Sequence, residues 1–107
     1  MTINCTILPS ADNVAFIFRS LPLDETARQR AAEIKLELAS YRLLAAAEQL
    51  RSPRLVRVAV VQNRICGRTI DPVEKQRDAL HRRISDITEV AFKAGVNIIC
   101  YQETWRK

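Results

Sequence analysis

The feature that most restricts the fold is a helical pattern placed between two short apolar segments. Apolar residues recur in steps of three and four over residues 72–94, which indicates a helix with one buried side. The flanking segments, 55–61 and 96–101, are rich in β-branched and aliphatic residues and predict strands. Because a helical connection of this length joins strands that are parallel and adjacent, the sequence predicts one right-handed βαβ unit.

The ends of the predicted helix carry local signals. Asp71 suits the N-cap position, Pro72 the first helical position, and Glu74 a capping-box-like pattern. Gly95 suits the left-handed residue that often follows a helix. The residues expected to form the buried stripe are Leu80, Ile84, Ile87, Ala91 and Ala94.

A second helical pattern precedes this unit. Asp24 is a suitable N-cap, and an apolar stripe with steps of four and three runs from residue 27 to residue 45. We therefore predict one long helix over residues 24–50, ended by Ser52 and Pro53. This helix either covers the second face of the sheet or docks elsewhere.

The chain divides into three predicted parts. Residues 1–23 form a poorly defined lead, whose first eight residues fit either a short strand or an unstructured segment. Residues 24–53 form a helical extension, and residues 54–107 form the α/β part. A parallel sheet needs cover on both faces and more than two strands, and strand 96–101 is left with an unpaired edge. The chain therefore looks like the opening of a larger α/β domain.

Composition narrows the function classes. The 107 residues allow one small domain, and 48% hydrophobic with 27% charged residues indicates a globular protein. The net charge of +5 favours anionic partners in general. Because there are two glycines, a glycine-rich nucleotide loop is excluded. Without a long apolar run or a signal-peptide pattern, we expect a cytoplasmic protein that makes no membrane contact.

The cysteines and the single histidine give no metal pattern. Cys5, Cys66 and Cys100 have no C-x-x-C spacing, so reduced thiols are expected, and neither a metal nor a cofactor is predicted. We expect Cys100 to be buried in its strand. We place Cys66 in a loop with no adjacent base, and His81 at the boundary of the apolar stripe.

Strand 96–101 leads directly into Gln102 and Glu103. In α/β folds the carboxyl ends of strands are where ligands bind, so Glu103 is a candidate general base. The commoner alternative for Glu103 is a solvated loop charge, and Gln102 either orients a ligand or caps the strand.

A basic tract of five arginines extends across the first predicted strand and comprises Arg51, Arg54, Arg57, Arg64 and Arg68. These arginines either contact phosphate groups or form a solvated edge and loop, and the second interpretation is favoured.

Four segments, taken in order, resemble the β-ureidopropionase (β-alanine synthase) family of the nitrilase, or carbon–nitrogen hydrolase, superfamily. The Gln-Glu-x-Trp sequence that begins at Gln102 is fairly specific in its strand context, and the ordered series is more so. The resemblance runs from about Tyr41 to Trp105, is fainter back to Leu21 and is absent before that. The segments are 48–58, 61–63, 79–84 and 95–105.

The resemblance implies an α/β fold, an incomplete αββα nitrilase-like sandwich preceded by a helical extension used in oligomer contacts. It implies hydrolysis of N-carbamoyl-β-alanine to β-alanine, ammonia and carbon dioxide, the last step of pyrimidine breakdown. In that family a cysteine attacks the carbamoyl carbon, a lysine stabilises the tetrahedral intermediate and a glutamate acts as base. The glutamate falls on Glu103.

The lysine and cysteine of the family lie further downstream, and Lys107 and Cys100 do not match them. The loop at 66–69 and the first twenty residues also depart from the family. We therefore expect an N-terminal fragment, from truncation, alternative splicing or an incomplete gene model, that is inactive alone. Its expected ligand, in the full-length enzyme, is a small ureido acid.

Two alternatives stay open. The first is a non-catalytic interaction module, in which the helix over 24–50 and the open strand edge associate with a full-length homologue or in a homo-oligomer. The second is a small basic nucleic-acid binder resting on the arginine tract. The aromatic content of 6% is low for stacking on bases, so we expect no nucleic-acid partner.

Overall fold

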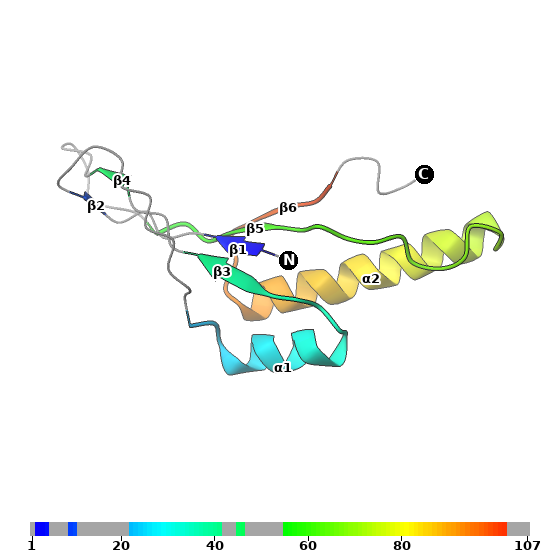
Figure 1. Ribbon diagram of the computed structural model, residues 1–107, viewed down its shortest axis with the longest axis horizontal. Coiled ribbons are helices and arrows are strands. Elements are labelled where there is room, and N and C mark those ends of the chain that lie inside the picture. Colours follow the sequence, from blue (N-terminus) through cyan, green and yellow to red (C-terminus); the bar gives the residue numbers. More distant parts are fainter. Residues whose placement is uncertain (1, 5–8, 11–21, 42–44, 47–54, 103–107) are drawn as a thin grey trace.

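The computed structural model describes residues 2–4, 9–10, 22–41, 45–46 and 55–102 of the chain (Figure 1). In chain order the elements are β1 (Thr2–Asn4), β2 (Pro9–Ser10), α1 (Glu25–Glu33), β3 (Ala39–Tyr41), β4 (Ala45–Ala46), β5 (Val58–Val60), α2 (Val73–Lys93) and β6 (Ile98–Cys100). One sheet has four strands in the order β3-β1-β5-β6, and β2 pairs with β4 in a second, parallel sheet.

The predicted βαβ unit is confirmed. β5 and β6 are parallel neighbours, with Val58 opposite Ile98 and Val60 opposite Cys100, and α2 connects them. Both strands are shorter than the segments predicted for them. β6 is a terminal strand of the described sheet, as expected, so the fold is an α/β arrangement that fits part of a layered sandwich.

The sheet is larger than the sequence indicated. β1 lies antiparallel to β5 and parallel to β3, so residues 2–4 form a strand, one of the two structures expected for the first eight residues, of which 1 and 5–8 lie outside the described part. β1 therefore pairs with the edge of β5 that faces away from β6. The four strands thus form a mixed sheet around the parallel pair.

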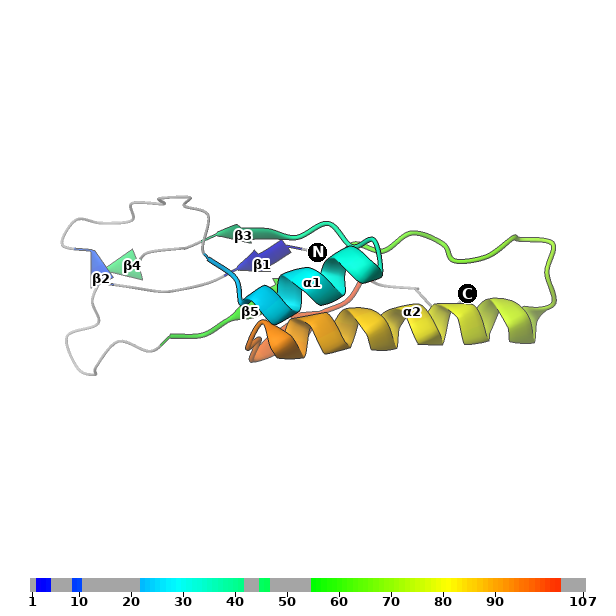
Figure 2. The ribbon, with the colours of Figure 1, turned by 90° about the horizontal axis from the view of Figure 1, so that it is seen from below.

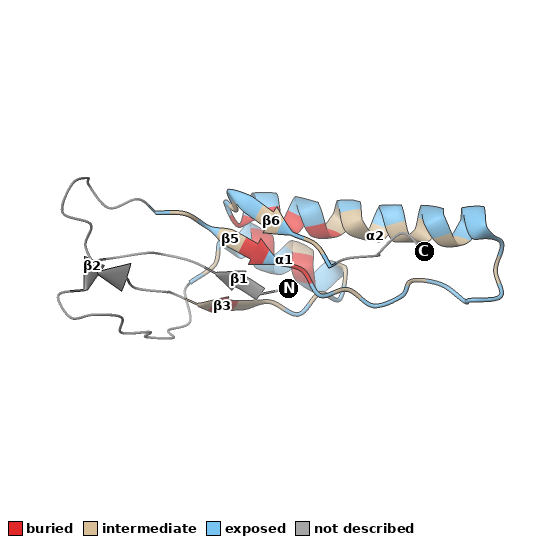
Figure 3. Cartoon of the chain, turned by 90° about the horizontal axis from the view of Figure 1, so that it is seen from above, coloured by how far each residue is buried: buried red, intermediate tan, exposed pale blue. Residues whose placement is uncertain are grey.

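Both helices cover the same face of the sheet, and Figures 2 and 3 show the helix layer and the strand layer from opposite sides. Of the two placements considered for the first helix, docking beside α2 is the one observed. Alanines on α1 let the two helices approach closely over the sheet. The core between the layers consists of Ala27, Ala31, Ala59, Val61, Ile87, Val90, Ala91 and Ala94.

The prediction of one helix over residues 24–50 is wrong for residues 34–41 and 45–46. The rest of that range, 42–44 and 47–50, lies outside the described residues, as do Ser52 and Pro53. Asp24 caps the helix as expected, with its carboxylate accepting from the backbone N–H of Thr26 at 2.8 Å. Lys35 then turns left-handed at φ 53°, and Leu36 N donates to Ala31 O at 2.8 Å, which closes a Schellman motif. The following segment pairs with β1 as β3, a partner distant in sequence that helical periodicity does not reveal.

The ends of α2 differ in how well they were predicted. The N-cap is Pro72 and makes no side-chain capping bond, so the assignment of Asp71 as N-cap is wrong by one position. The carboxylate of Asp71 lies 3.5 Å from the Nζ atom of Lys75 instead. At the other end Gly95 has φ 70°, and Val96 N donates to Ala91 O at 3.1 Å, which confirms the predicted left-handed cap.

The buried stripe of α2 is confirmed in its second half. Ile87, Ala91 and Ala94 are buried, together with Val90, which the predicted stripe omitted. Leu80 and Ile84 are only partly buried, because α1 and the sheet cover the C-terminal half of the longer helix. Neither described helix combines the length and apolar character needed to cross a bilayer.

Candidate functional site

The carboxyl ends of β5 and β6 meet at one edge of the sheet, which we call the carboxyl rim and define by Asn63 and Gln102. The ladder continues past β5 because Val61 N donates to Cys100 O at 2.9 Å. One step further, Asn63 N donates to the side-chain Oε1 of Gln102 at 2.8 Å, which replaces a main-chain acceptor. This bond supports the strand-capping interpretation of Gln102.

Asn63 also carries an unsatisfied donor. Its side-chain Nδ2 has no contact with solvent and no hydrogen-bond partner among the residues that the structure describes. Leaving a buried donor unpaired costs about 1–3 kcal/mol, so this amide is the polar group of the rim with most to gain from an acceptor. Sequence analysis gave Asn63 no role, although it follows Ala59 and Val61 in the alternation of β5.

Tyr101 connects this rim to the helix layer. Its hydroxyl group is hydrogen-bonded to the Thr88 hydroxyl on α2, and Thr88 Oγ1 also donates to the carbonyl oxygen of Ile84 at 2.7 Å. Tyr101 is therefore on the helix-covered face of the sheet. By strand alternation, Gln102 belongs to the opposite face.

Glu103, the candidate general base, lies outside the described residues, as do Trp105 and Lys107. Its role therefore stays a prediction. The described residues nearest to it in sequence, Tyr101 and Gln102, are both held by the side-chain bonds above. The local sequence folds this way because the strand ends where an amide and a phenol replace aliphatic residues.

The two cysteines that the structure describes, Cys66 and Cys100, do not gather at the rim, and Cys5 lies outside the described residues. Cys100 is exposed, which corrects the expectation that it is buried in its strand. Its side chain alternates with that of Ile99 and belongs to the sheet face that neither helix covers. Cys66 is half-buried in the loop after β5, and its Sγ lies 3.5 Å from Arg64 O. His81 is exposed on α2.

The basic tract does not form one surface in the part of it that the structure describes. Arg57 precedes β5, and its backbone N donates to Asn97 Oδ1 at 2.9 Å. Arg64 and Arg68 follow β5 in the connecting loop. All three arginines are exposed, which agrees with the favoured interpretation of a solvated edge and loop.

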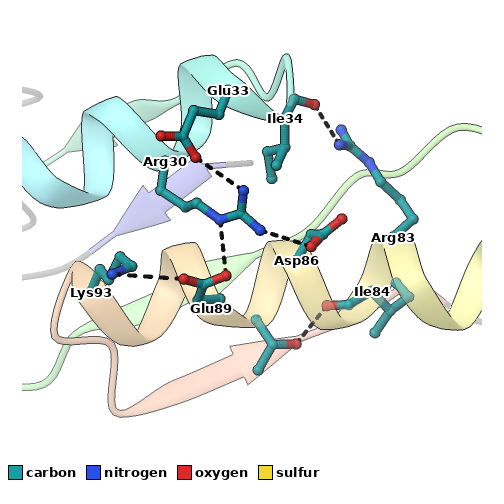
Figure 4. A network of polar contacts seen from close by, with 9 residues as sticks. Arg30, Glu33, Ile34, Arg83, Ile84, Asp86, Glu89 and Lys93 are labelled. Atoms are coloured by element: carbon teal, nitrogen blue, oxygen red, sulfur yellow. Dashed lines mark hydrogen bonds and ion pairs between the residues drawn. The ribbon is translucent and has the colours of Figure 1, made fainter.

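A polar cluster between the helices, which sequence analysis missed, holds α1 on α2 (Figure 4). The Arg30 guanidinium lies 2.9 Å from Glu89 and 3.0 Å from Asp86 on α2, and 3.1 Å from Glu33 on its own helix. The hydrogen bond from Arg30 lowers the pKa of Glu89, and the hydrogen bond to Glu89 raises the pKa of Arg30. Because Arg30 and Asp86 are far apart in sequence, no local pattern could have revealed this contact.

The contacts of this cluster hold the two helices together and leave no carboxylate in it without a cation. Lys93 Nζ adds a second cation 3.7 Å from Glu89, and Arg83 Nη1 donates to the Ile34 carbonyl oxygen at 2.6 Å, which caps the end of α1. Each carboxylate that faces Arg30 is thereby engaged. Within the described ranges, no group of three His, Cys, Asp or Glu side chains is placed to hold a metal ion.

Comparison with known proteins gives a partial answer to identity. No family model matches the chain. The chain is 36% identical over 83 residues to the beta-ureidopropionase of Arabidopsis thaliana, and the matched part makes up 78% of this chain and 20% of the relative. It thus spans about a fifth of the length of the curated relative that it matches. The similarity links the chain to beta-ureidopropionase at the level of the family.

Proposed function

We propose that the chain is part of a β-ureidopropionase-like amidohydrolase and supplies that enzyme's glutamate base, Glu103. The observation that carries this proposal is the similarity to the Arabidopsis enzyme over 83 residues. The parallel β5–α2–β6 unit supports it, because that unit leads the chain to a carboxyl rim immediately before Glu103.

The reaction proposed for the whole enzyme is the hydrolysis of N-carbamoyl-β-alanine with one water, which yields β-alanine, ammonia and carbon dioxide. Glu103 would accept the proton of a cysteine thiol as the thiolate attacks the carbamoyl carbon, would pass that proton to the leaving ammonia, and would then accept a proton from the attacking water. A lysine would stabilise the negative charge of the tetrahedral intermediate. The cysteine and the lysine are contributed by other parts of the enzyme, since Cys100 belongs to the uncovered sheet face.

A segment exchange tests the proposal. The matching segment of the Arabidopsis enzyme is replaced by this chain, and ammonia release from N-carbamoyl-β-alanine is measured. We expect turnover, with a loss of about 100- to 10,000-fold in the Glu103→Gln variant, because a positioned base contributes that much to the rate. Glu74→Gln, an exposed change in the first turn of α2, is the matched control and should leave turnover unchanged.

Two results would overturn the proposal. One is an active exchange enzyme in which Glu103→Gln has no effect. The other is robust turnover by the 107-residue chain alone that is abolished by a change at Cys100 or Cys66, since the nucleophile would then lie within this chain. We expect the isolated chain to release no ammonia.

A second candidate function is that of a non-catalytic module that associates with a full-length homologue. The observation that favours it is the uncovered face of the parallel pair, where Val60 is 50% and Ile98 is 52% exposed beside the terminal strand β6. Edge strands with apolar neighbours pair readily with other chains. Co-purification with a co-expressed homologue would support this function, and a monomer with a cooperative thermal transition would count against it.

A further inference from the structure

Gln102 bonds to the chain that follows β5 at the point where a side chain takes over from the main chain. Val61 N donates to the main-chain oxygen of Cys100 at 2.9 Å, as a parallel ladder requires. Two residues further on, Asn63 N donates to the side-chain Oε1 of Gln102 at 2.8 Å. In an unbroken parallel ladder the acceptor at this step is the main-chain oxygen of residue 102. The side-chain amide therefore continues the pairing after the main chain has left the ladder.

A glutamine side chain suits this task in reach and in charge. Its amide oxygen is carried one methylene further from the main chain than that of asparagine, so it can cross the space between two chains that are separating. The oxygen is a neutral acceptor at every relevant pH, so the bond to Asn63 N does not depend on an ionisation.

The preceding residue is held from the other side. The hydroxyl group of Tyr101 is hydrogen-bonded to that of Thr88 on α2, and Thr88 Oγ1 donates to the Ile84 carbonyl oxygen at 2.7 Å. Two successive residues are thus bonded in different directions, Tyr101 to the helix layer and Gln102 to the neighbouring chain. Rotation of the strand end about its own axis would break one of these bonds. Because a peptide unit is planar, the chain leaves Gln102 in a defined direction.

We propose that Gln102 is a positioning residue, whose side-chain bond to Asn63 N fixes the direction in which the chain leaves the carboxyl rim and thereby orients the base that follows. Gln102 acts through the covalent bond to the next residue. The inference rests on the proposed role of Glu103, and it adds the residue before the base to the machinery of that role. A displacement of about 1 Å in a reacting group can cost about 100-fold in rate, so a fixed strand end matters for the reaction.

The kinetics of the segment-exchange enzyme test this role, with ammonia release from N-carbamoyl-β-alanine as the readout. Gln102→Met keeps the length of the side chain but removes the acceptor, whereas Gln102→Glu keeps an oxygen acceptor at the same reach. We expect Gln102→Met to lower kcat by about 10- to 100-fold with KM little changed, because a misplaced base slows the chemical step and leaves binding intact. Gln102→Glu should recover most of kcat at about pH 8, where both carboxylates are ionised.

Gln62→Met is the matched control, because it makes the same change at an exposed glutamine that precedes Asn63 in sequence. It should leave both kcat and KM unchanged. All variants are assayed at a temperature at which circular dichroism shows each of them folded, so a lower kcat reports the geometry of the site and not a loss of folded enzyme.

Hydrogen exchange at the Asn63 backbone amide observes the bond itself, without turnover. In the isotopically labelled 107-residue chain, this amide should exchange about tenfold faster or more in Gln102→Met than in the unchanged chain, because it has lost its acceptor. In Gln62→Met the exchange rate should stay as it is in the unchanged chain.

Three results would overturn the inference. They are an Asn63 amide that exchanges at one rate in the unchanged chain and in Gln102→Met, a Gln102→Met enzyme with an unchanged kcat, and a Gln102→Glu enzyme as slow as Gln102→Met. A failure of the proposed function looks different, because Glu103→Gln then keeps full turnover and the inference falls with it. If only the inference fails, Glu103→Gln loses turnover while Gln102→Met does not.

Discussion

Replacing Gly95 by alanine tests how the turn between α2 and β6 is held. Gly95 has φ 70°, and an ideal Cβ built on it lies 2.8 Å from Arg57 Nη1. The left-handed conformation costs an alanine about 1–2 kcal/mol. The contact adds less, because the guanidinium is the end of a flexible, exposed side chain and can move away. We therefore predict a loss of about 1–2 kcal/mol in the free energy of unfolding.

Urea unfolding followed by circular dichroism measures this loss, and in a domain of this size it corresponds to a melting point lower by about 4–8 °C per kcal/mol. In the Arg57→Ala background, Gly95→Ala should be less costly than in the unmodified chain by about 0.5 kcal/mol or less, because only the contact with Arg57 is relieved. Gly67→Ala is the control for backbone strain without a steric contact, because φ is 98° there but no atom lies within 4 Å of an added Cβ. An unchanged or more stable Gly95→Ala protein would refute the reasoning.

Three further predictions concern the core, the helix contact and the uncovered face. Ile87→Ala should cost about 2–5 kcal/mol in urea unfolding, because Ile87 is fully buried between the helices and the sheet, whereas the exposed Ile70→Ala should change stability by less than about 0.5 kcal/mol. Because Arg30 lowers the pKa of Glu89, their contact contributes fully above the ordinary value of 4.5 and is lost as the pH falls through the lowered value. The melting point should thus fall less on acidification in Arg30→Met, and an equal fall in both proteins would contradict this. Cys100 should react with a thiol reagent without denaturant, and a thiol that reacts only after unfolding would show that its face is covered.

The elements with complete local signals were predictable from sequence. The apolar periodicity of α2, its glycine cap and the β-branched residues on either side lie within one continuous stretch. The parallel arrangement of β5 and β6 therefore followed from the rules for helical connections. The start of α2 was misplaced by one residue because Asp71 and Pro72 are both acceptable near a helix N-terminus.

The parts that depend on distant partners were not predictable. β3 pairs with β1, so Ala39–Tyr41 form a strand although Tyr41 also fits the predicted helical stripe. Arg30 meets carboxylates that lie more than fifty residues away. Cys100 is exposed because both helices lie on the other face of the sheet, and no pattern within β6 indicates this.

The candidate site was predictable in part. The resemblance named Glu103, and the strand pattern predicted a sheet rim at Gln102. The contact of Asn63 with Gln102 depends on the register between β5 and β6, which appears only once the two strands are paired. Alternation along β5 supplied a signal, since a polar residue follows Ala59 and Val61 in the buried phase.

The pairing of β5 with β6 is the basis of the candidate site, because it brings Asn63 and Gln102 together at the carboxyl rim. Hydrogen exchange at consecutive β6 amides, measured by NMR, tests it most directly. Ile98 N donates to Arg57 O at 3.1 Å, and parallel geometry directs the Cys100 amide to β5 as well, while the amides of Ile99 and Tyr101 face the open edge. We predict slow exchange at Ile98 and Cys100 and fast exchange at Ile99 and Tyr101. The reverse pattern, or uniform exchange along the strand, would contradict the register and the site built on it.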